Sequence, residues 1–512
     1  MDPAQHQQVV ELQSYLYTLY HASSTTIRDE ANRWLHDWQS NPAAWPLVHD
    51  ILSGRAALST IPPSSDAEVY YFCAQTLRTK ITRDFEELDA SMRAALPGSV
   101  LAMLARHQAV SFIRTQLSLG MAMLGMHIPG SAWRELDASS SSMIEWVSKR
   151  LFGEPTMRHV LLEILTVVPQ EAMAYQPSLL PARRREIERE MRVAGLPKAL
   201  EVLEALAGDG NAMGAMSAMG AMSANNNNKG MDGENTKHVL EALAAWLRLG
   251  GSPMPGDAGG AASSGASMDP STYLTSSLIP LAINSLQKEE GPFYAAVDAV
   301  IEIIFCSSAQ GRPKPELAGL VQAMVAQVMG LLPQFHVCIQ KAMNERDHDD
   351  VYDGDHAEQA KALARLFAEV GEAYADLICE ATPEVMGPVE ALLDVCRYPE
   401  MEVASISFNF WHRVSFTLSA GKRPHGLNWE GAVLPEAEAE RRIAAFRGYF
   451  ERLVETLTEK TRYSEESEHW HSDEKNDFKY TRQAVSDLLL DATDVVGPDA
   501  CVSSSPSSPC RR

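Results

Sequence analysis

The chain has 512 residues, and 44 lysines and arginines against 67 aspartates and glutamates give it a formal net charge of −23. This acidic balance argues against nucleic acid or an anionic membrane as the main partner, because both attract a basic surface. Basic protein partners suit an acidic surface, although solubility alone would also explain it.

The cysteines and the amino terminus bear on the compartment. Seven cysteines are scattered along the chain without a CxxC pair or a secreted-type framework, which fits a reducing cytosol or nucleus. The start, MDPAQHQQVVELQ, has no basic region followed by an apolar run, so we expect no signal peptide. None of the apolar runs reads as a membrane span, so we also expect no membrane insertion.

Apolar residues recur at helical spacing along most of the chain. In 9–20 they stand at Val9, Leu12, Leu16 and Leu19. Strands with alternating polarity and hairpin turns are missing, so the sequence predicts an all-α fold. The same helical spacing predicts further helices over 26–39, 44–53, 67–81, 91–107, 107–128, 156–172, 238–250, 290–307, 317–335, 360–381 and 402–418.

The helices are short and are joined by turns with proline or glycine, such as Pro97–Gly98 and Pro129–Gly130. Helix pairs repeating about every 40 residues are typical of an α-solenoid of HEAT or armadillo type. In such a stack one side becomes a long binding groove. Two or three separate helical bundles are the alternative.

Composition divides the chain into seven segments. Two of them, 207–235 and 251–272, contain almost no large apolar residues, so we expect disordered insertions there. The remaining predicted segments are repeats over 1–95, 96–206 and 273–497, a repeat helix over 236–250, and a disordered tail over 498–512.

Three features resemble reactive or metal sites. Cys73 lies in the middle of a predicted helix among apolar residues, so a buried core position is favoured over a reactive thiolate. The acidic run 344–358 lacks two of the oxygen ligands of a calcium loop, which leaves a solvated loop or an acidic lip for a basic partner. His469 and His471 have no second ligand pair at a useful distance, so an exposed linker is expected.

Nucleotide-binding and hydrolase motifs are missing, so we expect no enzyme activity, no cofactor and no metal site.

The densest basic cluster is Arg183–Arg184–Arg185, where Arg184 and Arg185 can pair with Glu188 on one helix. An exposed face of ion pairs is one interpretation. A contact between Arg183 or Arg184 and an acidic partner is the other.

Several strings together carry a family resemblance. They are YFCAQTLRTKITRDFEEL (71–88), LLEILTVVPQEA (161–172), RRREIE (183–188), ISFNFWHRVS (406–415) and DFKYTRQAVSDLLLDATDVVG (477–497). In this order and spacing the chain resembles the transportin-3 type of nuclear import receptor, within the importin-β (karyopherin) superfamily, and more distantly the importin-13 type. The region of resemblance is the amino-terminal half of such receptors.

The resemblance implies a HEAT-repeat solenoid that shuttles between cytoplasm and nucleus. It implies binding of protein cargo, typically splicing factors rich in arginine and serine, and of Phe-Gly repeats in the nuclear pore. Ran–GTP would bind the amino-terminal repeats and release the cargo. Since the family's cargo-binding arginine-rich helix lies in its second half, recognition of arginine–serine cargo is in doubt for this chain.

Residue roles follow from the same resemblance. Phe72, Leu77 and Ile81 are expected in the core, whereas Gln75, Thr76 and Lys80 would face Ran. Phe408, Trp411 and Val414 are expected in the core between helices, and Asn409 would satisfy backbone groups across the repeat. An export or bidirectional karyopherin and a Ran-independent helical scaffold are the alternative functions.

Overall fold

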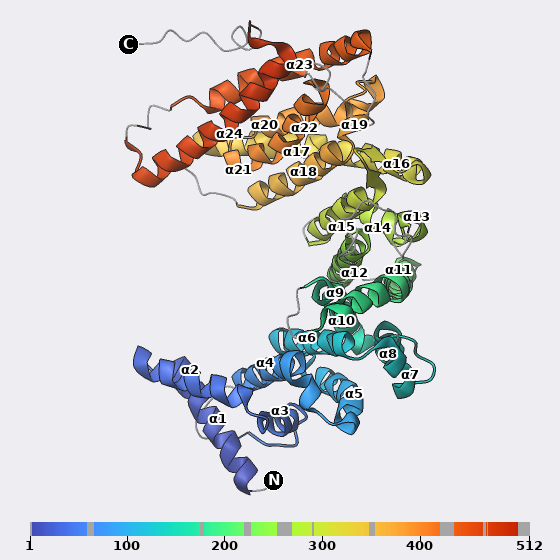
Figure 1. Cartoon of the computed structure of the whole chain (residues 1–512), viewed down its shortest axis with the longest axis vertical. Coiled ribbons are helices and arrows are strands. Elements are labelled where there is room, and N and C mark those ends of the chain that lie inside the picture. The colour runs from blue at the N-terminus through green and yellow to red at the C-terminus, as the bar shows by residue number, and fades with distance from the viewer. Residues whose placement is uncertain are drawn as a thin grey trace. The chain divides into compact units, whose positions relative to one another are not determined.

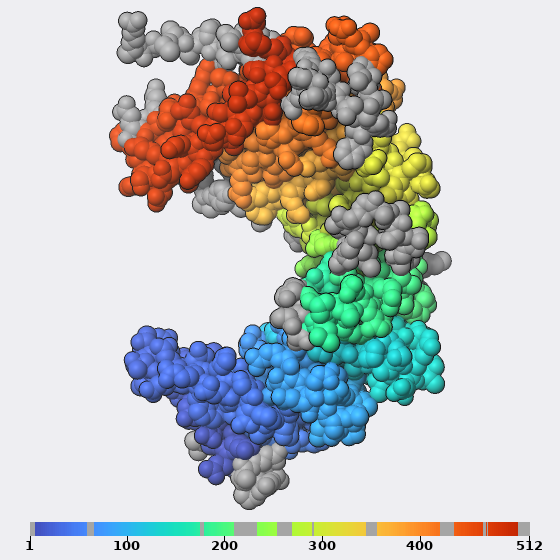
Figure 2. Space-filling view, in the orientation of Figure 1, coloured from blue at the N-terminus to red at the C-terminus, as the bar shows by residue number. Residues whose placement is uncertain are grey.

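The computed structural model describes residues 3–58, 66–174, 179–219, 227–252, 269–288, 291–347, 354–419, 435–463, 467 and 469–499. The chain folds as two compact units, Met1–Pro280 and Leu281–Arg512. In each unit neighbouring helices lie side by side, and their side chains fill the space between the ribbons (Figure 1 and Figure 2).

The first unit is built from helices and short helical turns. In chain order they are α1 (Pro3–His21), α2 (Thr25–Ser40), α3 (Ala44–Leu52), α4 (Asp66–Asp84), a 3₁₀ turn (Phe85–Glu87), α5 (Ala90–His107), α6 (Ser111–His127), α7 (Gly130–Leu136), α8 (Met143–Leu151), a second 3₁₀ turn (Pro155–Met157), α9 (Arg158–Met173), α10 (Pro181–Glu190), a π-helical turn (Met191–Gly195), α11 (Leu196–Met219), α12 (Asn227–Gly251) and α13 (Pro270–Tyr273). Helix α14 (Leu278–Ser285) spans the boundary between the units.

The second unit is also helical, apart from one short hairpin. Its elements are α15 (Gly291–Ser307), β1 (Ser308–Ala309), β2 (Arg312–Pro313), a 3₁₀ turn (Pro315–Leu317), α16 (Ala318–Met329), α17 (Leu332–Asp347), α18 (Gly354–Ala373), α19 (Ala375–Ile378), a 3₁₀ turn (Pro383–Val385), α20 (Gly387–Arg397), α21 (Met401–Ala404), a 3₁₀ turn (Ser405–Ser407), α22 (Phe408–Ser419), α23 (Glu436–Lys460) and α24 (Ser472–Val496). The antiparallel β1–β2 pair was not predicted from the sequence.

Repeated helix-on-helix packing confirms the predicted all-α solenoid. In the first unit α4 packs on α6, α6 on α9, and α9 on α12 (Figure 1). In the second unit α15 packs on α18, α18 on α22, and α22 on α24. Each of these helices buries an apolar stripe between its neighbours, which is the way a helical repeat acquires a core. Phe408, Trp411 and Val414 are buried as predicted. Glu372 of α18 accepts from Asn409 Nδ2 of α22 at 2.9 Å, so Asn409 pairs with a carboxylate rather than with the backbone groups predicted from the sequence.

The low-complexity segment 207–235 is the clearest correction. Helix α11 continues to Met219 and α12 begins at Asn227, so most of this segment is helical rather than disordered. Alanine and methionine in 207–219 are good helix formers, and 227–235 leads directly into the part of α12 that is anchored in the core. Most of the second insertion, residues 253–268, and most of the tail, residues 500–512, lie outside the described residues.

The predicted helix over 317–335 is interrupted. It forms α16 and α17, with a break at Gly330 and Leu331. Contrary to the sequence expectation, the segment Pro315–Asn344 is long and apolar enough to qualify by composition as a membrane span. Of its most apolar stretch of 18 residues, 28% is buried inside the protein. Because the break divides this segment and Val321, Met324 and Val328 pack inward, it serves here as two helices of the second unit.

Candidate partner-binding surface

Two of the three residues expected to face Ran lie in the core of the first unit. Thr76 has no exposed surface; its hydroxyl donates to the Phe72 carbonyl at 2.8 Å and accepts from Gln39 Nε2 at 2.9 Å. Lys80 is 1% exposed, and its Nζ donates to Asp84 Oδ2 at 3.0 Å and lies 5.7 Å from the Trp45 ring centroid. The prediction that Thr76 and Lys80 contact a partner is therefore wrong for this structure.

Helical phase explains the error. The apolar stripe of α4 includes Cys73, Leu77 and Ile81, and positions three or four residues apart share a helix face. Thr76 and Lys80 fall on that stripe, whereas Gln75 falls on the opposite, exposed side. Cys73 is buried as predicted, and burial raises the pKa of its thiol, which makes it unreactive.

The exposed side of α4 continues onto α6 through an aromatic pair. Tyr71 and Phe112 lie edge to face, with ring centroids 5.6 Å apart and an interplanar angle of 74°. Phe112 is 47% exposed, which is high for a large apolar side chain. Tyr20, on α1, is 49% exposed, and its pKa is raised by burial and by the nearby Glu68 and Tyr71. Tyr20 therefore lies near Tyr71, and the ring contact that joins α4 to α6 is the Tyr71–Phe112 pair.

Polar side chains link α4, α6 and α9 beside the Tyr71–Phe112 pair. Arg78 donates to Gln116 Oε1 at 3.4 Å and forms an ion pair with Glu171 at 3.5 Å, which connects α4 to α6 and α9. Arg114, on α6, pairs with Glu163 on α9, and Thr115 bonds to the same carboxylate. We call the following set the α4–α6–α9 face: Tyr71, Gln75, Arg78, Phe112, Thr115, Gln116, Glu163 and Glu171.

This arrangement is suited to binding a protein. Exposed aromatic rings act as anchors at protein interfaces, and a surrounding polar rim supplies orientation.

Among the residues that the structure describes, no group of three or more His, Cys, Asp or Glu side chains is placed to hold a metal ion. The acidic run expected to form a loop falls partly on residues 348–353, outside the described ranges. His471 caps α24, and its backbone N–H donates to Glu474 at 2.7 Å.

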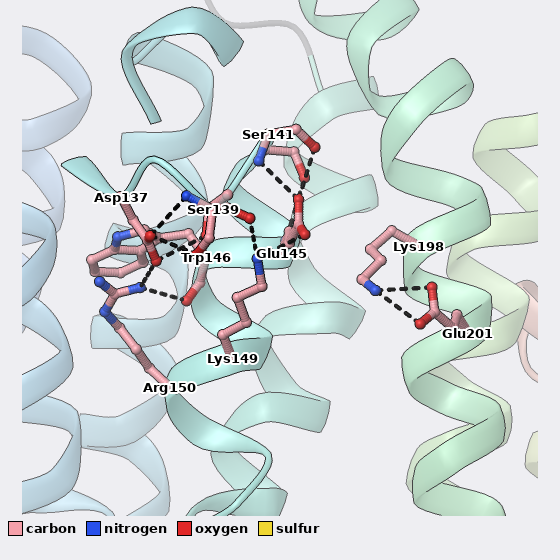
Figure 3. Close-up of polar contacts among 11 residues, drawn as sticks. Asp137, Ser139, Ser141, Glu145, Trp146, Lys149, Arg150, Lys198 and Glu201 are labelled. Atoms are coloured by element: carbon pink, nitrogen blue, oxygen red, sulfur yellow. Dashed lines mark hydrogen bonds and ion pairs between the residues drawn. The ribbon is translucent and has the colours of Figure 1, made fainter. Parts of the chain in front are cut away.

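A serine-rich turn between α7 and α8 forms a polar cluster that sequence reasoning missed (Figure 3). Glu145 accepts from the Ser141 backbone and hydroxyl, both at 2.8 Å, and the pKa of Glu145 falls to about 2, chiefly because of its hydrogen bond with Lys149. Asp137 accepts from Ser139, and Arg150 lies 4.0 Å from the Trp146 ring centroid. The signal in the sequence is the Ser-x-x-Glu capping pattern of 142–145. These contacts close the turn and stabilise it.

The arginine triplet has a structural role at its first residue. Arg183 is 16% exposed; it donates to the carbonyls of Met126 at 3.0 Å and Ile128 at 3.1 Å, where α6 ends. It also pairs with Glu186 at 3.0 Å and Glu190 at 3.3 Å. Positive groups stabilise the carbonyl end of a helix, so Arg183 is a cap for α6 rather than a free contact. Arg184 is half-buried on the same helix.

Replacing Arg183 with alanine is expected to lower the free energy of unfolding by about 2–3 kcal/mol, because the carbonyls at the end of α6 and the Glu190 carboxylate lose a charged partner. Arg185→Ala is the matched control, since Arg185 is exposed on the same helix, and it should change stability by less than about 0.5 kcal/mol. Urea unfolding monitored by circular dichroism measures both. Equal stability of the two variants would contradict the capping role.

Comparison with known proteins bears on the family and the fold. A family profile described as the Transportin-3/Importin-13 second TPR domain matches residues 355–427. The chain is 29% identical over 497 residues to Transportin MOS14 of Arabidopsis thaliana, covering 97% of this chain and 44% of that protein. The resemblance to the importin-β family is therefore confirmed. The chain is also 21% identical over 512 residues to Importin-13 of Homo sapiens, and the match covers 97% of this chain and 44% of that protein.

A solved structure shows the same importin-type fold. The structure titled "Importin13 cytosolic state" matches with a TM-score of 0.51 at 15% sequence identity, covering 85% of this chain and 43% of that one. The chain thus spans less than half the length of the relatives it matches, and the match is to their amino-terminal half. These relatives are transport receptors and not enzymes.

Proposed function

We propose that this chain acts in nuclear transport as an importin-β-type receptor that binds Ran–GTP through the α4–α6–α9 face. The observation that carries the proposal is the similarity to a transportin over 97% of the chain. On this proposal the protein shuttles between cytoplasm and nucleus, carries protein cargo, and binds Phe-Gly repeats during passage through the pore. Arginine–serine-rich splicing factors are the cargo class that the transportin-3 resemblance suggests for the longer receptors, whose arginine-rich cargo helix lies in the half that this chain does not match.

The α4–α6–α9 face supports this proposal in two ways. It lies within the amino-terminal repeats, where the family resemblance expects Ran, and it retains Gln75, the exposed one of the three residues first considered. It also presents the Tyr71–Phe112 pair, in which Phe112 is 47% exposed, Tyr71 is partly buried, and the two rings pack edge to face. Anchors that are ordered before binding reduce the entropy cost of association.

For Ran–GTP to release cargo, binding of either ligand must lower the affinity of the chain for the other. A stack of nearest-neighbour repeats can bend at small cost, so two ligands that favour different curvatures lower each other's affinity. In an export receptor Ran–GTP would raise the affinity for cargo, and in a static scaffold Ran–GTP would leave that affinity unchanged.

The sign of this coupling tests the function. An arginine–serine-rich splicing factor is captured on the immobilised chain, and Ran loaded with a non-hydrolysable GTP analogue is added, with Ran–GDP as the control. We expect the GTP form alone to release the cargo. Stronger retention would identify an exporter, and no effect of either form would favour a scaffold.

A further inference from the structure

A pocket opens beside the π-helical turn of the first unit. Its volume is about 50 Å³, and its walls come from the end of α6, from α7, from the start of α8 and from the π-helical turn. The apolar side chains that line it are Ile128, Trp133, Met143, Ile144, Met191 and Ala194. An engineered apolar cavity of about 150 Å³ holds benzene, so this smaller pocket suits the end of one aliphatic side chain better than an aromatic ring.

The walls of the pocket are fixed by the protein itself. The π-helical turn Met191–Gly195 forms one wall, and such turns occur mostly as single turns within α-helices and are frequent at functional sites. Gly195 allows close packing there, because a Cβ atom would lie 3.2 Å from two ring atoms of Trp246. Ser141, on the rim formed by the α7–α8 turn, is held by its hydrogen bonds to Glu145 (Figure 3). The pocket is therefore ordered before anything binds.

Helix α10, which leads into this wall, is basic in a chain whose net charge is −23. Its sequence PARRREIERE has more arginines than glutamates, and the π-helical turn adds Arg192. Glu186 and Glu190 both pair with Arg183. Glu188 interacts with the guanidinium group of Arg192. The carboxylates of α10, including Glu190 at the pocket wall, are therefore balanced by cations of the same segment.

Two arginines of α10 are available to a partner. Arg185 and Arg189 lie one turn apart and are exposed, and no residue that the structure describes forms an ion pair with either. Arg185 donates to the Pro181 carbonyl at 3.4 Å, which is long for a hydrogen bond. Val193 is 48% exposed; it comes one turn after Arg189 and directly before Ala194, which lines the pocket. Two guanidinium groups and an apolar side chain thus lie along the edge of the pocket.

We propose that this surface, which we call the α10 face and define as Arg185, Arg189, Val193, Ala194 and the pocket, binds an acidic protein segment that inserts one aliphatic side chain into the pocket. Exposed guanidinium groups form charge-assisted, often bidentate hydrogen bonds with carboxylates. An apolar anchor in a preformed pocket adds affinity at a low entropy cost. The acidic remainder of the chain repels the same segment and so confines it to this face. The α10 face lies outside the α4–α6–α9 face, so this proposal does not depend on Ran binding.

The probe is a fluorescein-labelled, glutamate-rich peptide with one central leucine, titrated into the full chain and followed by fluorescence anisotropy. The same peptide with glutamine in place of every glutamate, and an uncharged peptide of Phe-Gly repeats, are the comparison ligands. We expect the glutamate peptide to bind at least about 10-fold more tightly than either. Equal binding of all three, tighter binding of the Phe-Gly peptide, or no binding of the glutamate peptide would overturn the proposal.

Charge variants separate the α10 face from other exposed arginines. Arg185→Gln with Arg189→Gln should weaken the glutamate peptide by about 10-fold, because both carboxylate partners are lost. Arg28→Gln with Arg33→Gln, two exposed positions on α2, is the matched control and should change the affinity by less than about twofold. Equal losses in the two double variants would indicate nonspecific attraction and refute the site.

A filled pocket tests the aliphatic anchor. Ala194 is exposed at the pocket wall, so Ala194→Leu should occupy the pocket and weaken the glutamate peptide by at least about 5-fold. Ala94→Leu, at an exposed position of α5, is the control and should leave the affinity unchanged. The melting temperatures of both variants should stay close to that of the wild type, since both positions are exposed. If Ala194→Leu bound the peptide as tightly as the wild type, the pocket would not hold its side chain and the proposal would fail.

Discussion

Lys80→Glu is expected to reduce the free energy of unfolding by about 3–5 kcal/mol, the cost of breaking a buried ion pair by removing one partner. Lys80 is 1% exposed and bonds to Asp84 at 3.0 Å, so the substitution buries a carboxylate next to the partly buried carboxylate of Asp84. Chemical denaturation of the full chain measures the loss. The variant should lose affinity for partners only to the extent that the first unit unfolds.

A neutral pair serves as the control for Lys80. Lys80→Met with Asp84→Asn removes both charges and keeps similar volumes, and such replacements of a buried pair are often neutral. This double variant should fold and bind Ran–GTP normally. If Lys80→Glu retained wild-type stability and lost Ran–GTP, Lys80 would be a direct contact and its buried position here would be wrong.

The second large effect is expected at the aromatic pair of the α4–α6–α9 face. Tyr71→Ala with Phe112→Ala should weaken Ran–GTP by at least about 2 kcal/mol, or about 30-fold, because anchoring aromatics carry much of the energy of an interface. Isothermal titration calorimetry measures the affinity. The melting temperature should fall little, since both rings are partly exposed.

Met92→Ala is the matched control for the aromatic pair. Met92 is 56% exposed on α5 of the same unit and lies outside the α4–α6–α9 face. Its truncation should leave the affinity for Ran–GTP unchanged. A similar loss in both variants, or no loss at Tyr71 and Phe112, would exclude this face as the Ran contact.

Helical periodicity was sufficient to predict most of the fold. The burial of Phe72, Leu77 and Ile81 follows from an apolar stripe that is visible in the sequence. The same stripe contains Thr76 and Lys80, whose polar character suggested exposure. Buried polar residues are predictable only when their partners are known, and the partner Gln39 comes from a different helix, 37 residues away.

The function of Arg183 could not be read from the sequence for a related reason. Its carbonyl partners lie more than 50 residues earlier, at the end of α6. The sequence suggested ion pairs of Arg184 and Arg185 with Glu188, whereas the pairs that Arg183 forms are with Glu186 and Glu190. The cap depends on Arg183 reaching the end of α6 from α10, which the spacing of residues along one helix does not predict.

For the segment 207–235, the sequence predicted less regular structure than the protein has. Its repeated Gly, Ala, Ser and Met composition indicated disorder, yet helices extend into it from both sides. Helix propensity acts residue by residue and is reinforced when a helix is already nucleated by core packing. Composition statistics average over the whole segment and lose that local effect.

The nucleotide dependence of Ran binding tests the proposed function most directly. The full chain is titrated by calorimetry with Ran loaded with a non-hydrolysable GTP analogue and, separately, with Ran–GDP. We expect the GTP form to bind at least about 10-fold more tightly, and this preference to require Tyr71 and Phe112. Equal affinity for the two forms, or binding of neither, would contradict the assignment of this chain as a Ran-regulated transport receptor.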